Sequence, residues 1–367
     1  MFDFTSLDIL LQKAAATICP AIQLVVRWRG REICTRAYGW LDPETHSAPT
    51  TLTSRFDLAS LTKLFTVTAL MCLVEDGALT LEQPLSTVLP AFRGRRPIKP
   101  YEDPLHPGQL LTVAPEPGVV DVSTITFCQL LTHTSGLPAW RPLYLQPTAE
   151  AARGLALQTF CSYHPGTHVV YSDIGLILLG MALERLTGLA LDTLIQQRVL
   201  APLGLAHTGY SPSPEIRAEI APTEFCRWRG RRVRGVVHDE NAYRLGGVSA
   251  HAGLFSTATD VAIFGQSFLA APPPLLRPET IATMITLQAQ EGPVRRGLGF
   301  ALWQGAEDLA AGYVFGHTGF TGTLLWIDPE RELVISLLTN EVYQGRQDRK
   351  IAALRKAVRE MISRGVG

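Results

Sequence analysis

The chain has 367 residues, of which 46% are hydrophobic and 18% charged, so it has ample material for a large core. This balance excludes intrinsic disorder and fibrous repeats. The 33 Lys and Arg residues equal the 33 Asp and Glu residues, which gives a formal charge of zero. Nucleic-acid-binding proteins usually carry a basic excess, because neutralising phosphates supplies most of their affinity. We therefore expect no nucleic-acid partner.

The cysteines and the N-terminal residues indicate in which cellular compartment the chain is expected. The six cysteines lie far apart and form no CxxC pair, so the sequence does not support a zinc ribbon or a thioredoxin-like motif. Their apolar neighbours predict buried thiols in a reduced compartment. Residues 1–20 make a poor secretory signal, and the longest apolar run, residues 174–183, has about half the length of a membrane span. We expect a cytoplasmic chain without a membrane segment, unless a leader has been removed.

The first quarter of the chain predicts a helix, two strands and a second helix. Residues 5–18 have an amphipathic helical pattern. Residues 22–28 alternate between apolar and polar side chains, which predicts a half-buried strand, and a second strand ends near Gly39. Residues 61–74 are apolar on nearly every face, so we expect this helix to lie in the middle of the protein.

The middle of the chain is mostly helical and contains two unusual segments. Residues 93–122 hold six prolines among polar residues and glycines, which predicts a long surface loop. Helical patterns follow at residues 124–131 and 171–186. Five arginines crowd residues 225–237 and predict a hairpin with an exposed basic face. A nucleic-acid patch is the less favoured interpretation of the same residues.

The C-terminal part returns to strands. Residues 322–327 and 333–338 predict a hairpin around the turn at residues 328–330, and residues 346–362 predict a final helix. The order of helix, strands, mostly helical middle, strands and helix indicates an α+β fold with an inserted helical region.

Ser60 and Lys63 stand at the start of the apolar helix. A spacing of three puts both side chains on one helix face, with Cβ atoms about 5–6 Å apart. Ser60 is then at the positive end of the helix, where its own N–H is free. Burial lowers the pKa of a lysine toward that of a base, so we expect Lys63 to activate Ser60. The alternative is an ordinary N-cap serine followed by a surface lysine.

Tyr171-Ser172-Asp173 opens the helix that begins near residue 174. The simple interpretation is that Ser172 or Asp173 caps this helix while Tyr171 packs at its end.

His317-Thr318-Gly319 lies on an expected strand between Gly316 and Gly322. Glycines on a strand allow another backbone to approach closely, so this segment fits a substrate-binding edge. Similar residues at 133–136 and 207–209 are interpreted as plain turns.

The three motifs in this order resemble the serine β-lactamase and penicillin-binding-protein superfamily. The resemblance is to the branch of class C β-lactamases, DD-carboxypeptidases and related esterases, in which the second motif begins with Tyr and His can replace the Lys of the third. Segments 56–59, 130–138, 247–256 and 316–329 add to it, so it covers nearly the whole chain.

The resemblance implies a β-lactamase/transpeptidase-like fold, an antiparallel sheet flanked by the terminal helices with an inserted mostly helical domain. The sheet domain would comprise residues 1–77 and 246–367. The insertion would comprise residues 78–245, with surface loops at 93–122 and 225–237 and the active site between the two domains.

The resemblance also implies a serine hydrolase that acts on ester or amide substrates of D-amino-acid peptide type. Ser60 attacks the carbonyl and forms an acyl-enzyme, and its proton passes to Lys63 or to a Tyr171 phenolate. The oxyanion rests on the backbone N–H groups of Ser60 and Phe320. The residues expected to bind substrate or tune the bases are Asp173, His317, Thr318 and Gly319. No metal or cofactor is expected; the partner is a small-molecule or peptide substrate, and the oligomeric state is left open.

Two departures from the family pattern bear on specificity. Asp173 replaces an Asn, and its charge favours the ammonium form of Lys63. His317 replaces a Lys, and it offers a cation to a substrate carboxylate only below a pKa of about 6.5. We expect weak or no β-lactamase activity, and weaker binding of carboxylate-bearing substrates as the pH rises.

Three alternatives and one cluster remain. The chain could be a DD-carboxypeptidase or β-lactamase proper, a penicillin-binding sensor without turnover, or a structural relative that has lost catalysis. The last should lack Ser60, Lys63 or Tyr171, which are all present. The cluster of residues 238–241 with His251 could line the cleft or bind a cation, but we favour a structural loop role and assign no metal.

Overall fold

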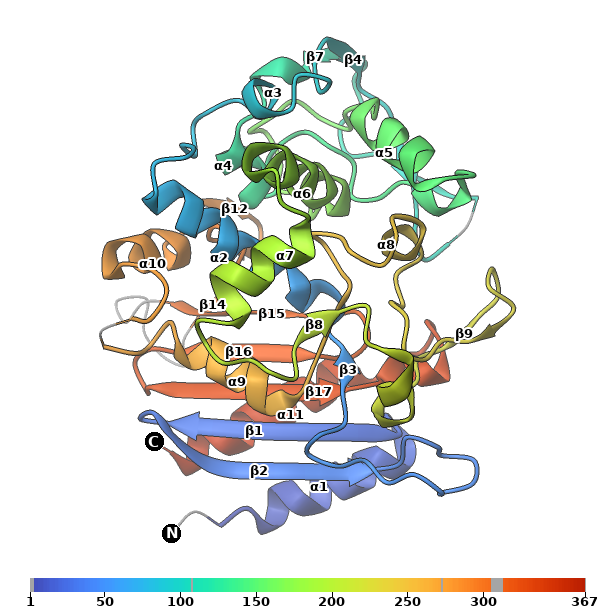
Figure 1. Cartoon of the computed structure of the whole chain (residues 1–367), viewed down its shortest axis with the longest axis vertical. Coiled ribbons are helices and arrows are strands. Elements are labelled where there is room, and N and C mark those ends of the chain that lie inside the picture. Colours follow the sequence, from blue (N-terminus) through green and yellow to red (C-terminus); the bar gives the residue numbers. More distant parts are fainter. Residues whose placement is uncertain (1–2, 107, 272, 305–312, 367) are drawn as a thin grey trace.

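The computed structural model describes residues 3–106, 108–271, 273–304 and 313–366. Its centre is one eight-stranded sheet whose neighbouring strands all run antiparallel (Figure 1). In sheet order the strands are β12 (Ala289–Glu291), β13 (Val294–Arg296), β14 (Ala301–Gln304), β15 (Tyr313–Thr318), β16 (Leu324–Asp328), β17 (Leu333–Thr339), β1 (Ala21–Trp28) and β2 (Arg31–Gly39). The first and last parts of the chain therefore build a single sheet, as expected.

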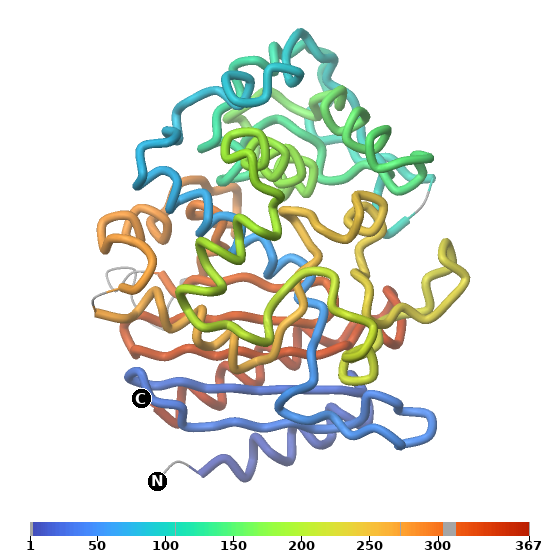
Figure 2. The backbone as a smooth tube through the Cα atoms, viewed as in Figure 1, coloured from blue at the N-terminus to red at the C-terminus, as the bar shows by residue number. Residues whose placement is uncertain are grey.

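Two helices from opposite ends of the chain cover one face of this sheet. They are α1 (Thr5–Thr17) and α11 (Ile351–Gly365), which contact each other and lie close to both termini (Figure 2). Alternate strand residues face them, because successive side chains on a strand point to opposite faces. This layer contains Leu7, Leu11, Ile22, Leu24, Ile335, Leu337, Leu354 and Val358.

The opposite face packs against α9 (Ala258–Gln266), beyond which lies α2 (Thr62–Glu75). The ring of Phe65 in α2 stacks on Phe264 in α9 with centroids 4.0 Å apart. Helix α2 is buried over almost its entire length, as its apolar sequence predicts. Because helices cover both faces, residues 21–26 of β1 are wholly buried, and the expectation of a half-buried strand is wrong.

The remaining helices form the part of the molecule above the sheet in Figure 1, apart from α10 at its side. They are α3 (Leu85–Val88), α4 (Phe127–Leu131), α5 (Ala149–Leu157), α6 (Asp173–Thr187), α7 (Leu191–Ile195), α8 (Glu240–Arg244) and α10 (Pro278–Ile285). Short turns of helix are η1 (Ala59–Leu61), η2 (Val122–Thr124), η3 (Leu143–Leu145), η4 (Gln196–Leu200), η5 (Pro214–Glu219) and η6 (Glu341–Gln344). The division of the chain into domains at 77/78 and 245/246 stays a prediction.

Several short strands lie outside the main sheet. Residues 93–122, expected to form a loop, contain two small antiparallel pairs, and each strand there has only two or three residues. Proline limits such strands because it lacks an N–H for the ladder. The expected hairpin at residues 225–237 is confirmed. These strands are β3 (Phe56–Asp57), β4 (Arg95–Pro97), β5 (Tyr101–Glu102), β6 (Leu110–Leu111), β7 (Val119–Asp121), β8 (Gly209–Tyr210), β9 (Phe225–Cys226), β10 (Arg231–Arg232) and β11 (Leu254–Ser256).

All six cysteines are unpaired, and five are buried, as their apolar neighbours predict. Burial raises the pKa of the thiols, to about 11 for Cys34 and Cys72 and to about 12 for Cys161. Across the described ranges, none of the helices taken singly has the length and apolar composition of a membrane span. The helices Asp173–Thr187 and Leu191–Leu200, which are bent relative to each other, reach the length and apolar composition of a span only when they are counted together.

Candidate active site

Ser60 lies in the short turn η1, directly before the buried helix α2. The preceding residue, Ala59, has a left-handed backbone with φ of 47°. Such a conformation is strained for alanine and needs support from its surroundings. Asp57 supplies it, because Oδ1 accepts a hydrogen bond from the Ala59 N–H (2.8 Å) and Oδ2 accepts one from the His238 N–H (2.6 Å). Asp57 is therefore a positioning residue for Ser60.

Lys63 is the most tightly held group of the site. Its Nζ donates to Ser60 Oγ (2.9 Å) and to the carbonyl of His251 (3.0 Å), and it pairs with Asp173 Oδ1 (2.7 Å). Burial would lower its pKa, but the neighbouring Asp173 and Tyr171 outweigh burial and the pKa of Lys63 is raised. The expectation that the pKa of Lys63 is lowered is wrong. The other expectation, that Asp173 favours the ammonium form of Lys63, agrees with the geometry.

Tyr171 lies against both Ser60 and Lys63. Lys63 Nζ is 4.9 Å from the centre of its ring, and the buried hydroxyl lies beside these two side chains without a hydrogen bond of good geometry. Burial raises the pKa of Tyr171 more than the Lys63 charge lowers it, so Tyr171 is a neutral phenol. Ser172 caps α6, as the simple interpretation predicts: its Oγ accepts from the Gly175 N–H (3.0 Å) and donates to the Pro138 carbonyl (2.7 Å).

His133 belongs to the site, which the sequence analysis missed by treating residues 133–136 as a plain turn. The backbone does turn there, with φ of 60° at His133, but the side chain is buried. Its Nδ1 accepts from the Ser172 N–H (3.0 Å), and its ring centre is 4.7 Å from that of Tyr171. Burial, Arg296 and Lys63 hold the pKa of His133 well below its usual value. A neutral His133 therefore fixes the position of Tyr171.

His317 lies on β15 with its ring centre 5.6 Å from that of Tyr171. Its Nδ1–H donates to the Thr318 carbonyl (2.7 Å), which leaves Nε2 as a buried acceptor without a described partner. Burial comes first among the causes that hold the pKa of His317 well below 6.5, and Arg296 and Lys63 act in the same direction. The expectation that His317 is a cation that titrates near neutral pH is wrong.

The cation beside Tyr171 on this side of the site is Arg296, which the sequence analysis did not single out. It lies on the three-residue strand β13, and its guanidinium carbon is 5.2 Å from the centre of the Tyr171 ring. Its Nε is buried without a hydrogen-bond partner, and the ion pairs of the described residues do not include it. Nothing in the local sequence marks this arginine, because its strand is short and Tyr171 is far away in the chain.

Gly319 and Phe320 follow β15 and lie against the turn that carries Ser60. A Cβ atom at Gly319 would be 2.5 Å from the Leu58 carbonyl oxygen and 3.4 Å from Ala59 Cβ, so only glycine permits this contact. Thr321 Oγ1 donates to the Asp57 carbonyl (2.7 Å) and holds the two segments together. Within the described ranges, the backbone N–H groups of Ser60 and Phe320 have no acceptor and are free to bind an oxyanion.

The cluster at residues 238–241 braces the cleft and also lines it. His238 donates from its backbone to Asp57 and bonds Glu224 through Nε2 (2.7 Å), while Asp239 caps α8. Asp239 Oδ1 bonds His251 Nε2 (3.0 Å), and ligand atoms of Asp173, Asp239 and His251 lie within 4.8 Å of one another. Since the Lys63 ammonium already pairs with Asp173, we assign no metal to this set.

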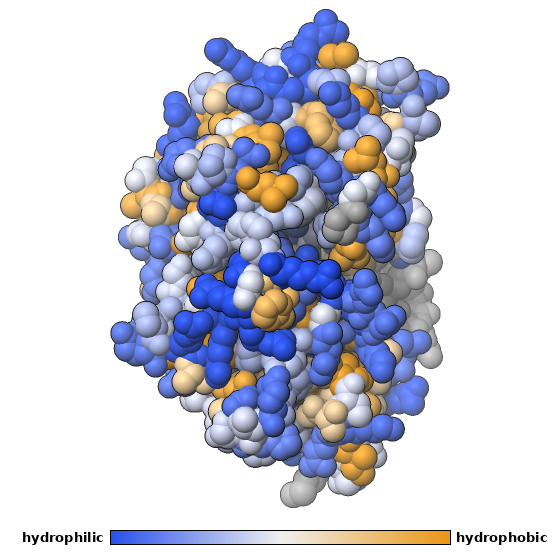
Figure 3. Space-filling view, turned by 90° about the vertical axis from the view of Figure 1, so that its right-hand side faces the viewer, coloured by the Kyte–Doolittle hydropathy of each residue, from blue (hydrophilic) through white to orange (hydrophobic). Residues whose placement is uncertain are grey.

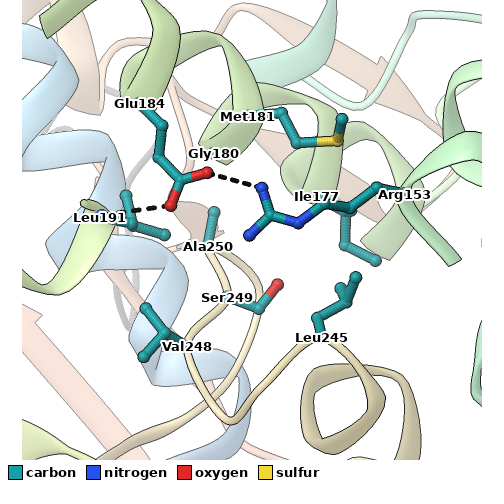
Figure 4. A pocket seen from close by; sticks show the side chains of 10 residues that line it. All are labelled: Arg153, Ile177, Gly180, Met181, Glu184, Leu191, Leu245, Val248, Ser249 and Ala250. Atoms are coloured by element: carbon teal, nitrogen blue, oxygen red, sulfur yellow. Dashed lines mark hydrogen bonds and ion pairs between the residues drawn. The ribbon is translucent and has the colours of Figure 1, made fainter. Parts of the chain in front are cut away.

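A small cavity lies behind this cluster, between α6, α7 and residues 245–250. Ser249 points into it, and Glu184 holds Arg153 across it (2.9 Å) (Figure 4). Ser249 Oγ also bonds His251 Nδ1 (2.8 Å). His251 thereby links this cavity to Asp239 and, through its carbonyl, to Lys63.

Comparisons with known proteins agree with this geometry. An N-acetylmuramyl-L-alanine amidase of Bacillus subtilis (strain 168) is 33% identical, over 91% of this chain and 80% of the relative. A protein of Escherichia coli (strain K12) named "Putative D-alanyl-D-alanine carboxypeptidase" is 31% identical, over 78% of this chain and 69% of the relative. The octameric penicillin-binding protein homologue from Pyrococcus abyssi superposes with a TM-score of 0.72 at 22% identity, over 97% of this chain and 77% of the homologue.

The fold is thus the β-lactamase/transpeptidase-like fold expected from the motifs, and the class is that of serine hydrolases of β-lactamase and penicillin-binding-protein type. The Beta-lactamase family model matches residues 9–359. The chain belongs to this family and is a hydrolase.

Proposed function

We propose that the chain hydrolyses an amide bond to alanine in a carboxylate-bearing, D-amino-acid peptide-like substrate through a Ser60 acyl-enzyme, and that it also accepts simple esters. The observation that carries this proposal is the 2.9 Å hydrogen bond between Lys63 Nζ and Ser60 Oγ, in a site where Tyr171, Arg296 and His317 keep unpartnered polar atoms. Buried polar atoms without partners are costly, and a substrate would satisfy them.

In the first step Ser60 Oγ bonds to the substrate carbonyl carbon. Its proton moves to Lys63 Nζ as Lys63 passes a proton to Asp173 Oδ1, 2.7 Å away, so Lys63 stays an ammonium. The carbonyl oxygen becomes an oxyanion on the N–H groups of Ser60 and Phe320. When the intermediate collapses, the C–N bond breaks and the leaving amine takes the proton of the Tyr171 hydroxyl.

In the second step the Tyr171 phenolate, held beside the Lys63 ammonium, takes a proton from the attacking water. The hydroxide adds to the acyl carbon, and the bond to Ser60 Oγ breaks. Ser60 regains its proton from Lys63, which is resupplied by Asp173. Water has then replaced the proton that left with the amine, and Ser60, Lys63, Tyr171 and Asp173 are back in their starting protonation states, so the cycle needs no reactant besides the substrate and water.

The substrate class is inferred from the relatives and from charge. The names of both relatives denote bonds to alanine, N-acetylmuramyl-L-alanine in one and D-alanyl-D-alanine in the other. Arg296 is a permanent cation beside Tyr171 and suits a carboxylate on the substrate. Asp173, unlike the asparagine usual in the family, accepts but does not donate hydrogen bonds. We propose slow or negligible turnover of β-lactams on this difference from the family.

Intact-mass spectrometry tests the proposal. The protein is incubated separately with a fluorophosphonate, penicillin, a short-chain p-nitrophenyl ester and an N-acylated D-alanyl-D-alanine peptide. We expect a stable adduct with the first, a transient acyl adduct with the ester and release of D-alanine from the peptide. The Ser60→Ala variant is the matched control and should form none of these adducts. A stable penicillin adduct without any turnover would instead make the chain a sensor, and fluorophosphonate labelling of Ser60→Ala would refute the nucleophile.

A further inference from the structure

The hairpin that the sequence analysis singled out for its arginines forms a surface that the catalytic chemistry does not use. We call it the arginine–aromatic surface. It lies on the right-hand side of Figure 1, at the hairpin of β9 and at α8, and Figure 3 shows a broad hydrophilic area across this side of the molecule. It comprises Arg227, Trp228, Arg229, Arg231, Tyr243 and Arg244, and five of these six, all but Arg227, line an open hollow.

A row of aromatic rings leads from this surface to the segment that contacts the backbone of Asp173. The Ala139 carbonyl accepts a hydrogen bond from the backbone N–H of Asp173 (2.9 Å), and Trp140 directly follows Ala139 in the chain. From there ring centres are 6.1 Å apart for Trp140 and Tyr144, and 5.1 Å apart for Tyr144 and Trp228. Tyr243 closes the row at 6.0 Å from Trp228. The surface therefore lies outward of the cleft along one continuous path.

The hairpin is fixed in place rather than loosely attached. The Arg229 guanidinium donates to the carbonyls of Val237 (2.8 Å) and His238 (3.0 Å), just before Asp239 of the cleft. Arg244 donates to the carbonyls of Tyr144 (3.1 Å) and Pro147 (3.0 Å). Because these acceptors are neutral, they hold the arginines without cancelling their charge.

The surface is strongly cationic although the whole chain has no formal net charge. The arginine ion pairs of the described ranges all involve other arginines. The nearby carboxylate of Glu240 is bound by Arg346 instead. Three arginines without a described carboxylate (Arg229, Arg231 and Arg244) thus line one hollow, and Arg227 adds a fourth positive charge to the same hairpin. Such a concentration of one sign attracts a ligand of the opposite sign.

Two large aromatic side chains are left exposed within this charge. Trp228 is 38% exposed and Tyr243 is 37% exposed. Arg229 lies 4.2 Å over the Tyr243 ring, and Arg244 lies 5.4 Å over the Trp228 ring. These two guanidinium groups add positive charge beside the rings. Arg227 and Arg231 are exposed and make no side-chain hydrogen bond to the described residues, so their N–H groups are free for a carboxylate. Exposed Trp, Tyr and Arg together are the composition of binding hot spots.

We propose that the arginine–aromatic surface is a subsite for an acidic peptide portion of the substrate, distant from the bond that is cleaved. This inference rests on the proposed function, since it takes the occupant to be an extension of the Ser60 substrate. An extended acidic chain fits because the row of rings gives it a path from the cleft, and the unpaired arginines lie at the outer end of that path.

A matched pair of probes tests the charge. They are the p-nitrophenyl esters of N-acetyl-Glu-Glu-D-alanine and of N-acetyl-Gln-Gln-D-alanine, which differ only in the two carboxylates. We expect the wild-type protein to prefer the Glu ester in kcat/KM, through a lower KM. This preference should shrink as salt is raised from about 0.05 M to about 0.5 M, because salt screens interactions between exposed charges.

The ratio of kcat/KM for the Glu ester to kcat/KM for the Gln ester measures the preference for acidic residues. The variant Arg227→Glu/Arg231→Glu should lower this ratio about tenfold or more, because both arginines are exposed and their positive charges become negative. The matched control is Arg31→Glu/Arg95→Glu, two exposed arginines elsewhere with the same change in net charge. It should leave the ratio unchanged. Trp228→Ala should raise KM for both peptide esters while sparing p-nitrophenyl acetate. An equal fall of the ratio in both double variants, or no fall in either, would overturn the proposal.

Calorimetric binding of the free peptides to Ser60→Ala separates the subsite from the chemistry. Tighter binding of the Glu peptide, lost in the Arg227→Glu/Arg231→Glu background, supports the subsite even if Ser60 is not the nucleophile. Equal binding of the two peptides overturns the subsite even if Ser60 turns over esters. A short oligothymidylate that binds more tightly than the Glu peptide, with the same sensitivity to the variants, would also overturn it and assign the surface to single-stranded nucleic acid.

Discussion

Two groups of charged and polar side chains in this fold differ in how completely they are bonded. The bracing cluster consists of Arg346, Glu224, Glu240 and His238. Arg346 binds both carboxylates, and Glu224 also bonds His238 Nε2 (2.7 Å). In the catalytic group around Lys63, by contrast, Tyr171 Oη, Arg296 Nε and His317 Nε2 are buried without partners.

This difference separates a structural cluster from a functional one. A fully bonded buried charge group stabilises the fold only while every partner is present. A group with unsatisfied polar atoms gives up stability unless a ligand completes it. We therefore expect substitutions in the bracing cluster to change stability most and substitutions in the catalytic group to change activity most.

The largest effect should come from Ser60→Ala. Removal of the nucleophile should lower kcat/KM for p-nitrophenyl acetate by roughly 10³-fold or more. The melting temperature should change little, because one hydroxyl at a turn is lost. Paired kinetics and calorimetry check both halves, and a large drop in melting temperature would break the distinction between the two groups.

Lys63 and Tyr171 should act as one unit with Ser60. Lys63→Ala and Tyr171→Phe should each lower kcat/KM by roughly 10²-fold or more, and the double variant should lose little more than the worse single one. Losses that multiply fully would mean that the two residues share no proton path. The measurement is a double-mutant cycle on the same ester.

Asp173→Asn should change the pH profile. The substitution removes a charge that raises the pKa of Lys63, so that pKa should fall. It also removes the acceptor for the Lys63 proton, so the variant must use neutral Lys63. Activity near pH 7 should fall about tenfold and then rise with pH, because the neutral fraction of the amine increases. Parallel profiles for variant and wild type would contradict the proton path.

Arg346→Ala should act in the opposite way. It leaves Glu224 and Glu240 partly buried without their cation, so unfolding free energy should fall by about 2 kcal/mol, a value reduced for the partial exposure of the pair. We expect kcat/KM to change less than about tenfold. Lys356→Ala is the control, since its pair with Glu360 is exposed and should contribute nothing measurable. Denaturant titration of both variants gives the comparison.

The smallest effect should be a slope of stability with pH. His133 and His317 have a pKa well below 6.5 in the folded protein, so below that pH the unfolded chain binds more protons. Stability should therefore fall as the pH drops below about 6.5, by up to about 1.4 kcal/mol per pH unit for each histidine. His317→Gln should flatten this slope, and His317→Lys should destabilise the protein by burying a cation beside Arg296. A steeper slope in His317→Gln would contradict the neutral imidazole.

The sequence predicted the order of elements and the three motifs because both depend on local patterns. Ser60 and Lys63 share a helix turn, and their spacing alone predicts that they meet. The sequence did not predict that Arg296 and His133 belong to the site, because each contacts Tyr171 from a distant segment of the chain. Arg296 lies on a three-residue strand and His133 in a turn. A contact between segments that are far apart in the chain produces no periodic pattern of apolar residues in the sequence.

The ionisation states were the least predictable part. Burial and Asp173 oppose each other at Lys63, and the sequence does not give their relative size. At His317 the neutral form results from burial together with the field of Arg296 and Lys63. Such balances depend on distances of a few ångström, which only the folded arrangement fixes.

The buried cysteines described above have a consequence for chemical probes of this protein. Thiols compete with serine for electrophiles only as thiolates that reagents can reach. With the pKa of Cys34, Cys72 and Cys161 raised to about 11–12 and five of the six thiols enclosed, the native protein has little competing thiolate. A covalent inhibitor with a soft electrophile should therefore label the native protein little until the protein unfolds. A hard electrophile, such as a carbonyl- or phosphonate-based inhibitor, should label Ser60 alone.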